Sequence, residues 1–280
     1  MGRQQRPHRG SSRHRRSLGV EPLTGSLAQV RLLLARNLRE GLRNPVLAYA
    51  LPVVIPLTML ILVAKTLSVV TELPGFPTTN YAEWMTPAVI MLTAMTGVGY
   101  AATSLVIDIQ SGFLDRLRLL NAKPSSLLAS RLLFDVVRVL PAGLTLFVVG
   151  ILLGTDVNEG VVGVVLLFAL LTLWAAAYGG LYFVVALATR NAQAPLALAP
   201  LFLPLQFLST QFVPESLLPR WVQTASAWNP FTYMVDAARA VVTGPLTLDP
   251  VAKAVAVGVG FLVVTQIAAR WSFARAVDAA

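Results

Sequence analysis

The sequence contains no cysteine and only two histidines, and each shortage excludes a kind of chemistry. Without cysteine the chain can form neither disulfides nor thiolate metal sites. His8 and His14 both lie in an Arg-rich N-terminal tail whose composition is typical of disordered segments, so neither is placed to bind a buried metal or to act as a base. We expect no metal site and no catalytic residue in this chain.

A phosphate-binding loop is also missing, because the pattern Gly-x-x-x-x-Gly-Lys-Ser/Thr does not occur in the sequence. No internal repeat is visible, which argues against secondary transporters built from inverted repeats. The chain on its own therefore has no evident means of hydrolysing ATP.

Charge is scarce as well, since 12% of the residues are charged and 56% are hydrophobic. An average soluble protein has about 25% charged and roughly 45–50% apolar residues. The excess of apolar surface needs lipid, and a helix of about 20 apolar residues crosses a bilayer. The sequence predicts an all-α integral membrane protein with six spans, at about 46–66, 84–107, 132–153, 161–189, 192–213 and 250–270.

The positions of the basic residues predict the orientation of these spans. With the N-terminus inside, the inner segments hold the basic tail, the 31–43 region and eight further basic residues, namely Arg116, Arg118, Lys123, Arg131, Arg138, Arg190, Arg270 and Arg275. The outer segments hold only Lys65, Arg220, Arg239 and Lys253. Because cytoplasmic loops retain Lys and Arg, we expect a multi-pass protein of the cytoplasmic membrane with both termini in the cytoplasm. The excess of Arg over Lys, with abundant Ala and Val, suggests a bacterial source.

The formal net charge of +9 raises the question of nucleic-acid binding. Much of this charge lies in the segment 1–25, which we expect to be a disordered cytoplasmic tail. Such a tail favours a topology signal or a contact with anionic membrane lipids over a nucleic-acid partner.

The segment 26–43 predicts a helix that lies in the membrane interface. One side would carry Leu27, Val30, Leu34, Leu38 and Leu42, and the other Gln29, Arg36, Arg39, Glu40 and Arg43. Arg31 and Leu32 do not fit this division. The alternative is that the segment is only the cytoplasmic start of the first span.

A second amphipathic helix is expected at 112–122, between the second and third spans. Phe113, Leu114, Leu117 and Leu120 share one face, and Asp115 and Arg118 lie opposite. The helix is too short and too polar to cross the membrane. Its apolar face must therefore pack on the neighbouring spans or on another protein.

Two other features break the apolar pattern. Arg131, Asp135 and Arg138 are spaced four and three apart at the cytoplasmic end of the third span, so Asp135 can pair with either arginine. Charges at such depth are candidates for function, and an ion pair that only fixes the helix end is the alternative.

The segment 214–240 predicts an outer, re-entrant pair of helices with a break at Asn229-Pro230. An ordinary extracellular loop is the alternative for this segment.

Two stretches resemble the membrane subunit of type-2 ABC exporters, in particular permeases of the daunorubicin-resistance type. They are "GFLDRLRLLNAKPSSLLASRLLFDVVR" at 112–138 and "FLSTQFVPESLLPRWVQTASAWNPFTYMVDAAR" at 207–239. The second contains the family's Phe-x-Ser, Val-Pro, Leu-Pro-x-Trp, Asn-Pro and Asp-Ala-x-Arg elements and is the more specific. With the six spans, the resemblance covers a transmembrane domain at 26–275.

The resemblance implies a permease subunit of an ATP-driven exporter for a hydrophobic drug, antibiotic or lipid-like molecule. It implies that 112–122 is a coupling helix, aided by the helix 26–43, that docks on a separate cytoplasmic ATPase subunit. The residues in that contact would be Phe113, Leu114, Asp115, Arg116, Leu117 and Arg118.

The same resemblance implies an assembly in which two ATPase chains, which bind ATP and Mg²⁺, join this chain and a second permease chain that we expect to be identical. The transport path would run between the permeases along spans one, two and five. We expect substrate contacts there from Tyr49, Tyr100, Phe207 and Phe212. The segment 214–240 would close the outer side.

Two other functions are consistent with the sequence. One is an ABC permease that exports a polysaccharide or glycolipid, although the few aromatic residues within the spans favour a compact hydrophobic cargo. The other is a membrane assembly protein with no transport role, against which a neighbouring ATPase gene would argue.

Overall fold

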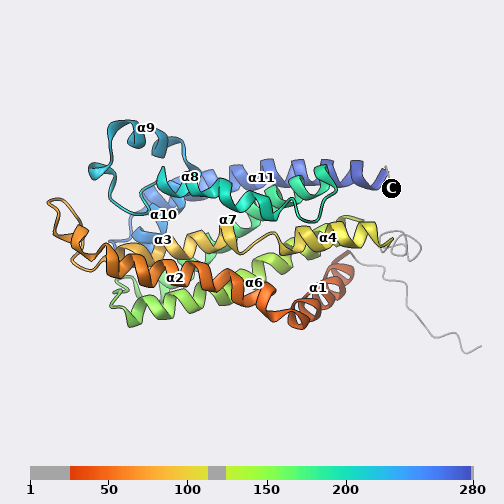
Figure 1. The fold of residues 1–280 in the computed structure, drawn as a ribbon, viewed down its shortest axis with the longest axis horizontal. Coiled ribbons are helices and arrows are strands. Elements are labelled where there is room, and N and C mark those ends of the chain that lie inside the picture. The colour runs from red at the N-terminus through yellow and green to blue at the C-terminus, as the bar shows by residue number, and fades with distance from the viewer. Residues whose placement is uncertain (1–25, 113–123, 279–280) are drawn as a thin grey trace, which may run out of the picture.

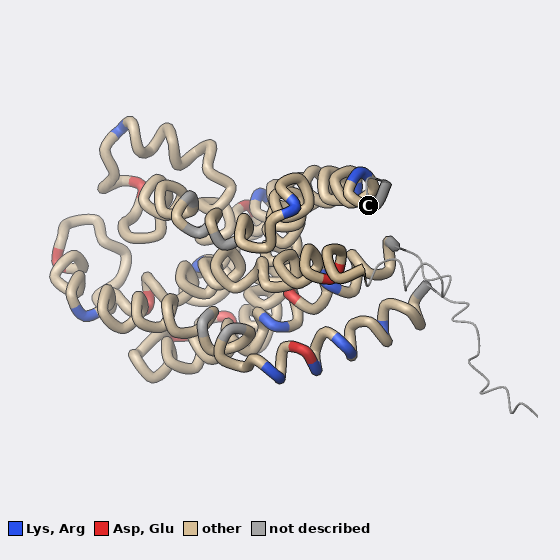
Figure 2. The backbone as a smooth tube through the Cα atoms, turned by 45° about the vertical axis from the view of Figure 1, so that its right-hand side comes forward, with Lys and Arg blue, Asp and Glu red and all other residues tan. Residues whose placement is uncertain are grey.

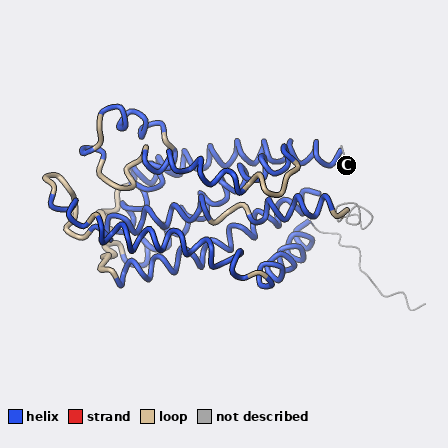
Figure 3. The backbone as a smooth tube through the Cα atoms, in the orientation of Figure 1, coloured by secondary structure: helices blue, strands red, loops and turns tan. Residues whose placement is uncertain are grey.

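The computed structural model describes residues 26–112 and 124–278, and this part of the chain consists of helices and loops without strands (Figure 3). The long helices lie side by side along the long axis of the molecule (Figure 1). The α-helices are α1 (Ser26–Arg43), α2 (Leu51–Thr66), α3 (Tyr81–Thr96), α4 (Tyr100–Gln110), α6 (Pro124–Leu152), α7 (Gly160–Thr189), α8 (Phe202–Phe207), α9 (Arg220–Trp228), α10 (Pro230–Val242) and α11 (Leu248–Asp278). A π-helix at Val46–Ala50 precedes α2, and short 3₁₀ helices lie at Ser68–Glu72, Leu196–Leu201 and Glu215–Leu217.

Five helical segments of the described chain are long and apolar enough to cross a membrane. They are Ala48–Thr66, Tyr81–Gln110, Ser125–Leu152, Gly160–Thr189 and Leu248–Ala276. They confirm helices at five of the six predicted spans, and the segment at Tyr81–Gln110 contains the break between α3 and α4. The all-α membrane architecture is therefore present.

The segment 192–213 is not the single long helix that the sequence predicts. It contains a six-residue 3₁₀ helix, then the six-residue α8, then irregular backbone up to Pro214. Pro195, Pro200 and Pro204 interrupt it, because proline lacks a backbone N–H and its ring clashes with the preceding turn. A search for uncharged runs does not reveal these interruptions, because the stretch contains no charged residue.

The long helices alternate in direction, so α1 and the C-terminal end of α11 lie at one end of the bundle and α9 lies at the other (Figure 1). We call these the α1 end and the α9 end. Basic residues on α1 and near the end of α11 mark the α1 end (Figure 2). Both described lysines lie towards the α9 end, because Lys65 is in the last turn of α2 and Lys253 is near the start of α11.

The predicted break in the segment 214–240 is confirmed at Asn229, where α9 ends and α10 begins. The Asn229 side chain accepts the N–H of Phe231 at 3.0 Å and so caps α10. Its amide also donates to the carbonyls of Leu205 and Leu208 at 2.7 and 2.8 Å. α10 packs against α3, α7 and α11, so it lies inside the bundle at the α9 end.

Close helix packing predicts a strong effect of a single added methyl group. A Cβ at Gly163 of α7 would lie 2.0 Å from the carbonyl oxygen of Val241 in α10, and backbone cannot yield as a flexible side chain does. We expect Gly163→Ala to lower the free energy of unfolding by about 1–3 kcal/mol, measured by thermal unfolding in detergent. The matched control is Gly260→Ala on α11, where nothing lies within 4 Å, and it should leave stability unchanged or slightly raised. Equal effects of the two changes would contradict this packing.

Candidate functional site

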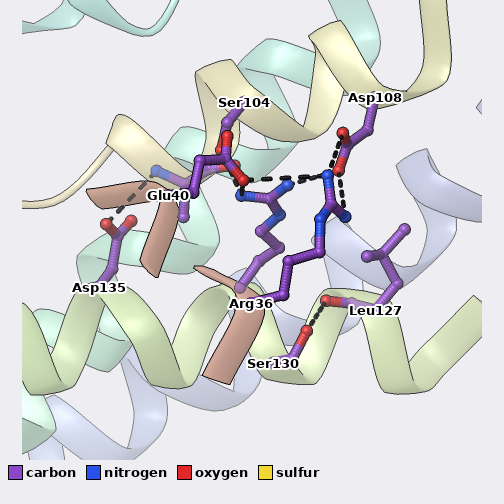
Figure 4. A network of polar contacts seen from close by, with 9 residues as sticks. Arg36, Glu40, Ser104, Asp108, Leu127, Ser130 and Asp135 are labelled. Atoms are coloured by element: carbon purple, nitrogen blue, oxygen red, sulfur yellow. Dashed lines mark hydrogen bonds and ion pairs between the residues drawn. The ribbon is translucent and has the colours of Figure 1, made fainter. Parts of the chain in front are cut away.

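A buried arginine of α6 joins that helix to both α1 and α4. The Arg131 guanidinium donates to the Ser104 hydroxyl at 2.7 Å and forms an ion pair with the Asp108 carboxylate. A second ion pair of 3.6 Å links Arg131 to Glu40 of α1. The Arg36 guanidinium lies 3.1 Å from Asp108 and completes the group (Figure 4). We name Arg36, Glu40, Ser104, Asp108 and Arg131 the inner charge network.

The spacing of these residues explains why they meet. Arg36 and Glu40 are four residues apart on α1, and Ser104 and Asp108 are four apart on α4, so each pair lies on one helix face. Arg131 is 0% exposed. Because a buried charge is tolerated only when it is paired and hydrogen-bonded, the two carboxylates allow Arg131 to lie inside the bundle.

Further along α6, a second ion pair lies at the break between α3 and α4. Asp135 and Arg138 are 3.1 Å apart and are 0% and 3% exposed. The Asp135 carboxylate accepts the backbone N–H of Gly99 at 3.0 Å and that of Ala101 at 3.4 Å. Arg138 donates to the carbonyl of Gly97. We name Asp135 and Arg138 the break pair.

The break pair satisfies backbone groups that the broken helix leaves free. Residues 97–99 are not helical, and Gly99 has a φ of 108°, which glycine adopts without a Cβ clash. Carbonyls at the end of α3 and N–H groups at the start of α4 then need partners, because lipid offers none. The Arg138 guanidinium binds a carbonyl at the C-terminal end of α3, and the Asp135 carboxylate accepts N–H groups at the N-terminal end of α4. Each charge is also opposite in sign to the dipole of the helix end that it contacts.

The same arginine reaches a second irregular stretch. It donates to the carbonyl of Ala48, which lies in the π-helix between α1 and α2. α6 therefore contacts α1 and α4 through the inner charge network and two irregular stretches through the break pair. These contacts run from the α1 end of the molecule to the middle of the bundle.

The structure changes the predicted position and pairing of the α6 charges. The sequence placed Arg131, Asp135 and Arg138 at the end of the third span, but α6 begins at Pro124, so Asp135 and Arg138 lie near the middle of a 29-residue helix. Asp135 pairs with Arg138, whereas Arg131 pairs with acids of α1 and α4. Of the two pairings that the sequence allows for Asp135, the structure therefore contains the one with Arg138.

The predicted face of the helix 26–43 is only partly right. Arg36 and Glu40 turn towards the bundle and enter the inner charge network, while Arg39 and Arg43 are exposed. Leu27 and Leu42, which the pattern placed on the apolar side, are 86% and 66% exposed, whereas Gln29, which it placed on the polar side, is buried. The cause is tertiary, because buried acids and arginines on α4 and α6 draw the polar side of α1 inwards.

The four aromatic residues expected along the path form two separate groups. Phe207, the last residue of α8, and Phe212, in the irregular stretch after it, stack with ring centroids 5.2 Å apart. Tyr100 lies 6.0 Å from the ring of Phe134 and 5.3 Å from the Arg138 guanidinium. Tyr49 belongs to the same inner group, because a Cβ built on Gly41 would meet both its hydroxyl and Phe134. A shared substrate site for all four stays a prediction.

The predicted coupling residues Phe113, Leu114, Asp115, Arg116, Leu117 and Arg118 lie outside the described residues. The described chain does show which elements flank them. α4 ends at Gln110 and α6 begins at Pro124, so these six residues lie in the chain segment that connects the two helices. The stretch therefore joins the two helices that Asp108 and Arg131 connect.

A further arginine, Arg239, is buried, although the sequence analysis did not identify it as a site residue. The Arg239 guanidinium lies 3.5 Å from the ring centroid of Trp84 and donates to the carbonyls of Trp84 and Gln211, at 3.2 and 2.8 Å. Asp236, one turn earlier, lies 3.5 Å away. The Asp-Ala-x-Arg element at 236–239 was the available signal, since aspartate and arginine three apart share a helix face. This cluster ties α10 to α3 at the α9 end.

Comparison with known proteins gives one consistent family. The family model described as ABC-2 type transporter matches residues 28–243. The probable doxorubicin resistance ABC transporter permease protein DrrC of Mycobacterium tuberculosis is 25% identical over 251 residues, which are 90% of this chain and 88% of that protein. The daunorubicin resistance ABC transporter permease protein DrrB1 of Streptomyces coeruleorubidus is 28% identical over 189 residues, which are 67% of this chain and 66% of that protein.

Proposed function

The chain belongs to the ABC-2 type transporter family as a membrane permease subunit of an ABC exporter, and we propose that it moves a hydrophobic drug, antibiotic or lipid-like molecule out of the cell. Two relatives are named for resistance to doxorubicin and daunorubicin, which supports a cargo of this class. Doxorubicin is therefore the first probe to test, as ATP-dependent uptake into inside-out vesicles.

The observation that carries the mechanism is the inner charge network. Asp108 and Arg131 lie on the two helices that flank the stretch 113–123. A displacement of that stretch would therefore act on both partners of this ion pair. Arg131 also pairs with Glu40 of α1, and the break pair follows on the same helix. We infer that force applied by a cytoplasmic partner at 112–122 is carried along α6 to the broken helix in the middle of the bundle.

The partner in this proposal is a separate cytoplasmic ABC ATPase, present in two copies. ATP and Mg²⁺ would bind to it, since the present sequence has no phosphate-binding loop. ATP can shift the permease between inward- and outward-open states only if the two states differ in free energy of interaction with the ATPase. The residues Phe113 to Arg118 would supply that difference.

We further propose six crossings of the cytoplasmic membrane with both termini in the cytoplasm. The stretch 192–213 supplies the remaining crossing, the fifth in chain order, as an interrupted path, because α7 ends at the α1 end and α9 lies at the opposite end of the bundle. The basic residues gathered at the α1 end favour that end as cytoplasmic. α9 and α10 would then close the outer side.

The second permease chain, which we propose is identical, would lie against α2. This helix exposes Val54, Ile55, Ile61 and Leu62, between 40% and 60% each, whereas α3 is almost wholly buried. The transport path would run between the two copies, near Phe207 and Phe212.

The test of coupling is the double substitution Asp115→Ala with Arg118→Ala. We expect the chain to stay in the membrane and to bind its partner more weakly, and we expect cargo-stimulated ATP hydrolysis by the complex to be lost. The matched control is Asp249→Ala with Lys253→Ala, which removes an exposed ion pair from α11 at the α9 end. Unchanged stimulation in the first variant would overturn the coupling proposal.

A further inference from the structure

The side of α1 that faces away from the bundle combines two kinds of side chain. Its exposed positions are Leu27, Ala28, Arg31, Leu32, Ala35, Arg39, Leu42 and Arg43. The three leucines are 86%, 55% and 66% exposed in chain order. No acidic residue lies among them. We name Leu27, Arg31, Leu32, Arg39, Leu42 and Arg43 the outward face of α1; Arg31 and Leu32, which did not fit the sequence pattern, belong to it.

The opposite side fixes the rotation of α1 about its own axis. Gln29 and Asn37 are 4% and 1% exposed, and Gly41 is buried against the ring of Phe134. The ion pairs of Arg36 and Glu40 add to this attachment. α1 therefore cannot turn its exposed leucines inwards without breaking the inner charge network.

The outward face suits neither water nor hydrocarbon alone. Three exposed leucines are costly in water, and three arginines are costly in lipid tails. The headgroup layer of a membrane accommodates both, because apolar side chains enter the acyl boundary while arginines reach the phosphates. The location agrees, since α1 ends at Arg43 and the first membrane-crossing segment begins at Ala48.

We propose that the outward face of α1 binds anionic phospholipid headgroups. Charge complementarity selects this occupant, because the face carries three cations and no acid. Lipid bound there would restrict the movement of α1. Because the ion pairs of Arg36 and Glu40 connect α1 to α4 and α6, it would also restrict the movement of those two helices. The inference rests on the membrane location of the chain and does not depend on the proposed cargo or partner.

The test compares lipids retained by the purified full-length chain in native mass spectrometry, with phosphatidylglycerol and phosphatidylcholine as probes. The variant is Arg31→Gln with Arg39→Gln and Arg43→Gln. Each arginine near an anionic surface contributes about fivefold in affinity, so we expect the preference for phosphatidylglycerol to fall by about 100-fold. The matched control, Lys65→Gln with Arg220→Gln and Lys253→Gln, removes the same charge from exposed positions outside α1 and should keep the preference.

Each other outcome overturns the proposal. An unchanged preference in the α1 variant would mean that these arginines do not hold lipid. An equal loss in both variants would mean that net charge alone attracts the lipid. Unchanged lipid retention in the α1 variant, with a cytoplasmic protein that co-purifies from the native membrane with the wild type but not with the variant, would assign the face to protein. Because a Gln variant can fail to fold, Arg31→Lys with Arg39→Lys and Arg43→Lys is also measured, and it must retain most of the preference.

Discussion

Replacing Arg138 by alanine is expected to abolish transport and to lower the free energy of unfolding by about 3–5 kcal/mol. The change leaves the Asp135 carboxylate buried without its cation. It also removes the donor from the carbonyls of Gly97 and Ala48, which lie in the two irregular stretches. Since a domain is stable by only about 5–15 kcal/mol, the loss should be evident as a large fall in the thermal transition in detergent.

A double-mutant cycle separates the ion pair from general damage. Arg138→Ala should cost less when Asp135 is already alanine, because no buried charge is then left unpaired. Arg138→Lys keeps the charge but loses the planar guanidinium, whose two nitrogens donate to separate acceptors. We therefore expect a folded chain with doxorubicin uptake reduced at least tenfold. Arg220→Ala, at an exposed position on α9, is the control and should match the wild type. Wild-type stability of Arg138→Ala would show that the break does not depend on this pair.

Replacing Asp108 by asparagine is expected to uncouple the transporter without unfolding it. The amide keeps the shape of the carboxylate but removes the negative charge that Arg36 and Arg131 share, and Glu40 is the acid that still pairs with them among the described residues. Loss of charge-assisted hydrogen bonds of this kind costs about 1.5–3 kcal/mol, so α1 should detach more often from α4 and α6. We expect at least a tenfold loss of doxorubicin uptake.

Hydrogen exchange checks this prediction at the site itself. Amide exchange in 26–43 should become faster in Asp108→Asn, while exchange in α11, which packs mainly on α7 and α10, should stay the same. Asp249→Asn is the matched control, because it neutralises an acid whose ion pair with Lys253 is exposed. If α1 exchanges at the wild-type rate while uptake falls, the inner charge network does not act through α1.

Most of the membrane-spanning helices can be predicted from the composition of the sequence and the spacing of its charges. Five of six apolar runs form the expected helices, because charges and turn residues bound them clearly. Asn229-Pro230 also marked a true boundary, since asparagine caps a helix and proline fits its first turn. The charged residues of α6 were found by their depth and their spacing.

The remaining features depend on contacts between distant residues. The break at 97–99 lies within a continuous apolar run, and only the spacing of Gly97 and Gly99 hints at it. The partners of Arg131 are 23 and 91 positions away, at Asp108 and Glu40, so no local pattern reveals them. The sequence also suggested a leucine face for α1, whereas the buried charges of α4 and α6 decide which side packs.

The central claim is that this chain is driven by an ATPase partner. The most direct measurement is affinity purification of the full-length chain from its native membrane under conditions that preserve complexes, followed by a vanadate-sensitive ATPase assay. We predict that a subunit with a phosphate-binding loop co-purifies, that it hydrolyses ATP, and that a hydrophobic cargo stimulates this activity. A chain that purifies alone and without ATPase activity would contradict the claim and favour a membrane assembly protein.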